Sequence, residues 1–165
     1  MSSAEVELLL FLMDEAFEAN EEHSLMGNLR TVSEDDWLWV PPLGRRRIGD
    51  IVWHVGGAKY MYDNHAFGDA RMTWDNPFLV PPPDQQATMI EAIQWMREGH
   101  RRLREHIAAL GEDDLSRRRL THWGELRETR WIVSVMIEHD LYHAGEINHI
   151  RALRQGNDNW AWESP

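Results

Sequence analysis

The chain has 165 residues, of which 42% are hydrophobic and 27% charged, so we expect one globular domain over residues 1–165. Its net charge of −11 argues against nucleic acid or an anionic membrane surface as a partner. The sequence has no cysteine, which excludes disulfides, thiolate metal ligands and a cysteine nucleophile, and favours a cytoplasmic location. The apolar run at residues 8–13 is too short for a membrane span and lacks the basic leader of a signal peptide.

The first predicted helix spans residues 4–29. Ser2 and Glu5 have the spacing of a capping box at its start. Acidic residues mark the side that faces solvent. The apolar residues recur at helical spacing: Val6, Leu9, Leu10, Met13 and Phe17.

The helical pattern breaks between residues 30 and 47. Residues 33–37 (SEDDW) are typical of a single capped turn, and the sequence PPLG at 41–44 stops any helix. Three arginines follow at 45–47. We interpret them as the solvated start of the next helix, although they could also attract an anionic substrate.

The second predicted helix spans residues 48–67, with Gly68 as its C-cap. His54 lies on a face of mostly small and apolar residues. A lone histidine on such a face is more often a hydrogen-bonded core side chain than a metal ligand. The residues that share the face are Asp50, Ile51, Ala58, Met61 and His65.

A loop over residues 69–83 ends in three prolines, which makes it stiff and extended. Asp84 then caps a third predicted helix, over residues 85–110 and closed by Gly111. His100 and His106 lie among arginines, and we interpret both as surface or edge residues. The predicted inner positions are Met89, Ile93, Met96, Leu103, Ile107 and Leu110.

Residues 111–127 form an irregular connection to the fourth predicted helix, which spans residues 128–155 and ends at Gly156. The tail beyond it contains Trp160 and Trp162. These two side chains either pack on the bundle or mark a surface for a partner.

Polar residues interrupt the apolar stripe of the fourth helix. His139, His143 and Glu146 fall on the same side of this helix. A buried imidazole must be hydrogen-bonded or metal-bound, and two histidines four residues apart can bind one ion. The alternative is a polar surface patch, and a metal site needs a third ligand from elsewhere. The apolar members of the stripe are Ile132, Val135, Met136, Ile150 and Leu153.

A weak internal repeat points to that third ligand. The acidic turn at 33–37 precedes the helix that carries His54, and a similar acidic turn at 111–115 precedes the helix that carries His139. Two similar helical hairpins would place these two helices in comparable positions. We therefore expect His54 to lie near His139 and His143.

Two segments resemble a known family. Residues 47–54 (RIGDIVWH) are similar to the start of the family's second helix, and residues 139–147 (HDLYHAGEI) to its last helix. Both are marks of the DinB-like (damage-inducible) superfamily. The resemblance implies an all-α four-helix bundle with long crossover connections. It also implies one divalent metal ion on His54, His139 and His143, coordination positions left for water or substrate, and a homodimer.

The resemblance also suggests an activity. Characterised relatives include bacillithiol S-transferases and mycothiol-dependent maleylpyruvate isomerase, and DNA repair is not implied. We therefore expect a metal-dependent thiol S-transferase or hydrolase that acts on a small-molecule substrate. The metal would be Zn, Ni or Fe. Since the chain has no cysteine, the thiol would be a low-molecular-weight cosubstrate. The alternative is a non-enzymatic bundle with a structural or sensing metal.

Two residues near the predicted ligands are candidate catalytic residues. Glu146 could accept a proton or hold a ligand histidine. Tyr142 could donate a hydrogen bond to a metal-bound anion, or simply pack as an aromatic. Asp140 points about 100° away from His139, and we expect it to face solvent or another helix.

A remote alternative is a metalloprotease. Residues 139–143 (HDLYH) resemble the motif HExxH with aspartate in place of glutamate, and His149 follows six residues later. In metzincins a glycine turns the chain three residues after the second histidine, but here that position is Glu146. The helix is therefore expected to continue and to carry His149 away from the ligands.

Overall fold

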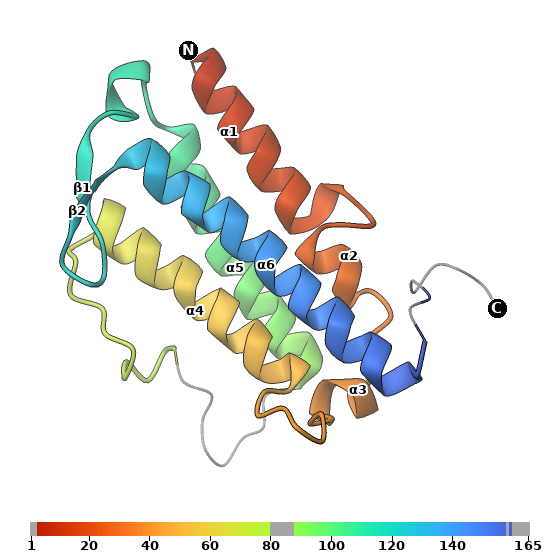
Figure 1. Cartoon of the computed structure of the whole chain (residues 1–165). Coiled ribbons are helices and arrows are strands. Elements are labelled where there is room, and N and C mark those ends of the chain that lie inside the picture. The colour runs from red at the N-terminus through yellow and green to blue at the C-terminus, as the bar shows by residue number, and fades with distance from the viewer. Residues whose placement is uncertain (1–2, 80–87, 158, 160–165) are drawn as a thin grey trace.

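Four helices pack side by side over the described residues, which are 3–79, 88–157 and 159 of the computed structural model (Figure 1). They are α1 (Ala4–Asp14), α4 (Ile48–Phe67), α5 (Met89–Ala108) and α6 (Thr129–Gln155). Helix α1 packs against α5 and α6, and α4 packs against the same two helices. Helices α1 and α4 therefore lie diagonally across the bundle, and so do α5 and α6. The two connections that cross the bundle run from α1 to α4 and from α5 to α6. This confirms the predicted all-α bundle with long crossovers.

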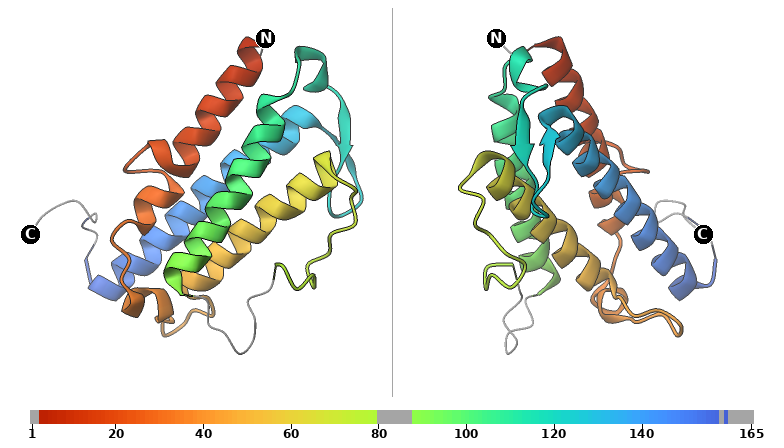
Figure 2. Two further views of the ribbon diagram at one scale, coloured as in Figure 1. Left: turned by 180° about the vertical axis from the view of Figure 1, so that it is seen from behind. Right: turned by 60° about the vertical axis from the view of Figure 1, so that its left-hand side comes forward.

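The connection from α5 to α6 contains secondary structure that we did not predict. After a short turn, η2 (Glu112–Asp114), strands β1 (Arg118–Leu120) and β2 (Leu126–Glu128) form an antiparallel hairpin. Gly124 turns the chain with a φ of 89°, a value that favours glycine. The hairpin lies at the end of the bundle where α4 ends and α6 begins (Figure 2).

The predicted continuous helix over residues 4–29 is wrong. Ser3, rather than Ser2, caps α1, which passes into a π-helical turn, η1 (Glu15–Ala19). The helix stops at Asn20. The Asn20 side-chain oxygen accepts hydrogen bonds from the backbone of residues 22 and 23, which stabilises a turn. Ser24 then caps a new short helix, α2 (Leu25–Leu29).

The second and fourth predicted helices are confirmed, and so is the capped turn between α2 and α4. Ser33 and Asp36 form a capping box at the start of α3 (Glu34–Leu38). Helix α4 begins and ends at the predicted residues, and Gly68 follows it. Helix α6 ends at Gly156, whose φ of 78° is left-handed.

The boundaries of the third predicted helix are wrong. Thr88 and Glu91 form the capping box that starts α5, and the helix ends at Ala108 instead of residue 110. Leu110 instead donates a backbone hydrogen bond to the Ile107 carbonyl, in a tighter turn. The predicted cap Asp84, the three prolines, Trp160 and Trp162 lie outside the described residues.

Small residues let α4 and α5 approach closely. The Trp95 ring lies against Gly56, where an added Cβ would come within 2.3 Å of it. The Tyr60 ring lies against Gly99 in the same way. The aromatic rings of one helix therefore fit against backbone on the other, which a larger residue would prevent.

The apolar core is divided by a layer of polar side chains. One apolar cluster lies toward the α3 end and a second toward the hairpin end. Between them, Lys59 of α4 forms two hydrogen bonds of 2.7 Å with the Asp140 carboxylate of α6, and both side chains are 1% exposed. Burial lowers the pKa of Lys59 and raises that of Asp140, while each charge opposes the shift of the other.

Two rings extend this polar layer to the other helices. The Lys59 ammonium lies 4.8 Å from the centre of the Phe17 ring on η1. The Phe17 ring stacks on His100 of α5 at a centroid distance of 3.7 Å. His100 is 6% exposed, so its prediction as a surface or edge residue is wrong. His106 is half exposed, as predicted.

We predict that breaking the Lys59–Asp140 pair destabilises the bundle. Lys59→Met leaves the Asp140 carboxylate buried without a cation, so the free energy of unfolding in urea should fall by about 3–5 kcal/mol. Combining it with Asp140→Leu removes both charges and should restore most of that stability. The control Arg101→Gln removes two exposed ion pairs, with Glu98 and Glu105, and should cost less than about 1 kcal/mol. A Lys59→Met variant as stable as the parent would contradict the prediction.

We also predict that His100 makes the fold sensitive to acid. Burial, and then the charge of Lys59, lowers the pKa of His100 from 6.5 to about 2. As the pH falls below 6.5, the unfolded chain takes up this proton before the folded chain does. The stability contributed by the neutral ring is present above pH 6.5 and is lost below it, by about 1.4 kcal/mol per pH unit.

The variant His100→Phe tests this. Its ring can still stack on Phe17 but cannot take up a proton. Between pH 7 and pH 5, the parent should therefore lose about 2 kcal/mol more unfolding free energy than the variant. Equal losses in urea titrations of the two proteins would show that His100 is not the acid-sensitive group.

Candidate metal centre

Three histidines from two helices meet on one side of the bundle. His139 and His143 are four residues apart on α6, so they project from the same face. His54 projects from α4, which runs in the opposite direction beside α6 (Figure 1). One ring nitrogen from each histidine can be chosen so that all three lie within 4.8 Å of one another. The predicted proximity of His54, His139 and His143 is confirmed.

The distances suit a single divalent ion. The Nε2 atoms of His54 and His139 are 3.1 Å apart. Two nitrogens bound to one tetrahedral zinc ion at about 2.0–2.1 Å are roughly 3.4 Å apart. The ring centroids are 4.5 Å apart for His139 and His143, and 5.0 Å for His54 and either partner. Small adjustments of these rings would complete a three-nitrogen site.

Glu146 determines which nitrogen of His143 is free to bind. The Glu146 Oε2 atom lies 2.8 Å from His143 Nδ1. Since a carboxylate accepts hydrogen bonds, Nδ1 carries the proton and Nε2 keeps its lone pair for a ligand. Metal-binding histidines commonly have such a carboxylate partner. Glu146 therefore holds His143, one of the two functions predicted for it.

The three imidazoles are in the form that binds metal. Burial, followed by the nearby His143 and His54, lowers the pKa of His139 to about 3. Burial is also the largest cause of the lowered pKa values of His54 and His143, although Glu146 opposes it at both sites. Neutral imidazoles at physiological pH are ready to coordinate a cation without first losing a proton.

The cluster is buried on one side and open on the other. His143 is 3% exposed, His139 is half-buried and His54 is exposed. The Trp74 ring lies parallel to the His54 ring at 6.0 Å. The exposed side chain of Tyr142 lies edge-on to His143 at 5.0 Å. Small molecules can therefore approach from the His54 side.

Some neighbours of the cluster were missed by sequence reasoning. Asp140 does face another helix, as expected, but its buried partner Lys59 was not predicted. The sequence did contain a signal for a buried lysine, because Lys59 lies within the small and apolar run at residues 55–61. Arg46 of the basic run is a further neighbour, because its Nε lies 3.7 Å from the Glu146 carboxylate.

The remaining histidines lie outside the cluster. Helix α6 continues without a break through His149, which is exposed, as the sequence predicted. His65 shares a helix with His54, but its Nε2 lies 2.8 Å from the Met72 carbonyl.

The catalytic roles of Glu146 and Tyr142 stay predictions.

A model of the DinB superfamily matches residues 17–147, which contain all three histidines. The chain belongs to this superfamily. No curated protein matches the chain. Among the described residues, no helix is both long and apolar enough to cross a membrane. The metal site implied by the superfamily fits this member, since three neutral nitrogens converge and one has a carboxylate partner.

We predict that each ligand histidine is needed for metal binding. His54→Ala, His139→Ala or His143→Ala should each weaken Zn(II) binding at least about 100-fold, because two imidazoles hold the ion poorly. Calorimetry on protein without a histidine tag measures this. The control His149→Ala should bind as the parent does, whereas a metzincin-like site would lose affinity. If His54→Ala bound zinc with unchanged affinity, the three-histidine assignment would be wrong.

Proposed function

We propose that this DinB superfamily member is a metal-dependent enzyme that transfers a low-molecular-weight thiol to a small electrophile. The observation that carries the proposal is the cluster itself, with three neutral imidazoles and an exposed side at His54. A structural zinc site has four protein ligands and no free position. Three ligands beside solvent are the arrangement of a catalytic site.

The proposed reaction follows from this donor set. A divalent ion on three imidazoles lowers the pKa of a bound water or thiol, which makes a nucleophile available near neutral pH. Because the chain has no cysteine, the thiol must be a cosubstrate. Its sulfur forms a bond to the electrophilic carbon, its proton leaves to solvent, and the leaving group departs with the electron pair.

The chain's own residues prepare the site for this reaction. Glu146 fixes the tautomer and orientation of His143 through a hydrogen bond of 2.8 Å. Trp74 and Tyr142 present aromatic surfaces beside His54 and His143, where an apolar part of a substrate can pack. Tyr142 also offers a hydroxyl that could donate to an anion.

Hydrolysis is the second activity that this arrangement supports, with water in place of the thiol. A homodimer stays a prediction of the superfamily resemblance. The identity of the metal is a further proposal among Zn, Ni and Fe, because imidazole binds all three.

The test is a transfer assay. Protein without a tag is stripped with a chelator, reloaded with Zn(II), Ni(II) or Fe(II), and mixed with a small thiol and a bimane electrophile that fluoresces on thiol addition. We expect one metal to restore the rate, His139→Ala to abolish it, and Glu146→Gln to lower it about 10- to 100-fold. His23→Ala, at an exposed position, is the matched control.

Each result has a definite meaning. Equal rates with and without metal, or in the parent and His139→Ala, would contradict the proposal. Metal binding without transfer would favour a structural or sensing site. Metal-dependent cleavage of an ester probe that needs no thiol would identify a hydrolase instead.

A further inference from the structure

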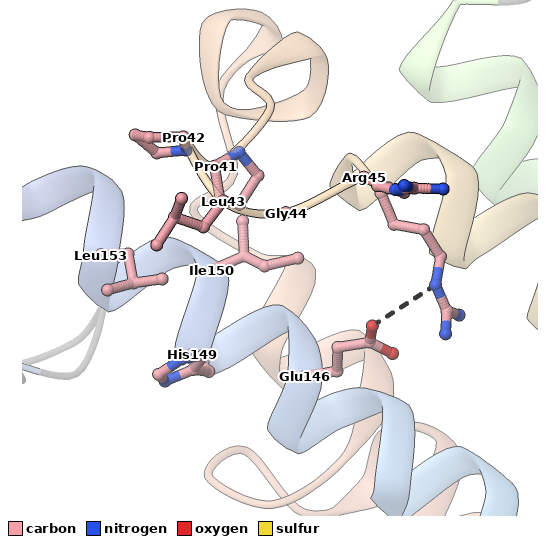
Figure 3. A pocket seen from close by; sticks show the side chains of 10 residues that line it. Pro41, Pro42, Leu43, Gly44, Arg45, Glu146, His149, Ile150 and Leu153 are labelled. Atoms are coloured by element: carbon pink, nitrogen blue, oxygen red, sulfur yellow. Dashed lines mark ion pairs between the residues drawn. The ribbon is translucent and has the colours of Figure 1, made fainter.

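A pocket of about 520 Å³ lies beside the histidine cluster. It is formed between the segment at 41–46, which leads into α4, and the C-terminal part of α6 (Figure 3). Its volume falls in the range of about 300–1,000 Å³ that is typical of small-molecule sites. The proposed thiol transfer does not by itself require this pocket.

The walls of the pocket are mainly apolar. Among the lining residues, Pro41 and Ile150 are buried, while Leu43 is fully exposed and Leu153 is 52% exposed. Exposed leucines beside a hollow provide a surface that an apolar ligand would cover. Figure 3 shows the side chains of Leu43, Ile150 and Leu153 gathered at one end of the pocket.

The other end of the pocket is cationic. Arg45 and Arg46 line it, in a chain whose net charge is −11. In the part of the chain that the structure describes, no carboxylate lies within 4.0 Å of the Arg45 guanidinium. Arg46 has only a distant partner, with 3.7 Å between its Nε and Glu146 Oε1. Both arginines can therefore bind an incoming anion.

This cationic end adjoins the histidine cluster. Glu146 lines the pocket and also accepts the hydrogen bond from His143. One carboxylate thus connects Arg46 to a predicted metal ligand. A molecule whose anionic group binds the two arginines would have its apolar part among the leucines and its charged end beside the cluster.

We propose that this pocket binds organic anions with an apolar tail, and that such anions are the substrate class of the enzyme. The second part of this proposal rests on the proposed function, whereas the first part does not. The carboxylate binds Arg45 and Arg46, and the tail packs on Leu43, Ile150 and Leu153. The apolar wall selects for tail length, and the arginines select for negative charge.

Calorimetry on the chelator-stripped protein tests the pocket without a metal. The probes are octanoate, octan-1-ol, which has the same tail without the charge, and butyrate, which has the charge with a short tail. Octanoate should bind at least about tenfold more tightly than either comparison, because two charge-assisted contacts and the apolar contacts act together.

Exposed positions allow variants that do not endanger the fold. Arg45→Gln combined with Arg46→Gln should weaken octanoate binding at least about tenfold and leave octanol unchanged. Leu43→Ser should weaken both probes about threefold or more. The matched controls Arg117→Gln and Ile90→Ser change exposed residues outside the pocket and should have no effect.

Two kinds of result would overturn the pocket assignment. One is octanoate binding that is absent, or that is unchanged in the arginine and leucine variants. The other is a dimer that dissociates in Leu43→Ser while octanoate affinity stays the same, since that would assign this face to a second copy of the chain. Octanoate binding by a protein that binds no metal would support the pocket while contradicting the proposed function, so the two failures are distinguishable.

Discussion

The buried ion pair between Lys59 and Asp140 is the constraint on which the rest of the structure depends. It joins α4 to α6 in the middle of the bundle, where an ammonium and a carboxylate can be buried only together. The two buried charges satisfy each other when Lys59 and Asp140 lie at the same level of the two helices, as they do here. Because Asp140 follows His139 directly, the same register brings His54 of α4 to the two histidines of α6.

The environment of the cluster explains its chemistry. Burial keeps the three imidazoles neutral, and Glu146 leaves the Nε2 lone pair of His143 free. The same carboxylate lies near Arg46, whose charge faces the apolar pocket. The ligands, their carboxylate partner and the pocket are thus connected through one residue. A variant at Glu146 would affect all three. Variants at Arg45 or Leu43 would change the pocket and leave the metal ligands unchanged.

The sequence predicted α4, α6 and the histidine pair of α6 because these depend on local periodicity. Spacing on one helix placed His139, His143 and Glu146 together, and a weak repeat with a family resemblance added His54. It did not predict the break at Asn20, where a side-chain oxygen accepts local hydrogen bonds from the backbone of residues 22 and 23 and so interrupts the apolar helical spacing. It did not predict the burial of His100, because this depends on a contact with a distant segment. Lys59 was missed for the same reason, since its role becomes visible only when Asp140 is beside it. The hairpin at 118–128 is too short to produce a period of two.

The most direct test of the central claim, that three imidazoles converge on one ion, is X-ray absorption spectroscopy at the zinc edge of the Zn(II)-loaded protein. The account predicts three imidazole nitrogens at about 2.0–2.1 Å, together with one or two light atoms from solvent. A spectrum that fits no more than one imidazole, or an ion coordinated mainly by carboxylates, would contradict it.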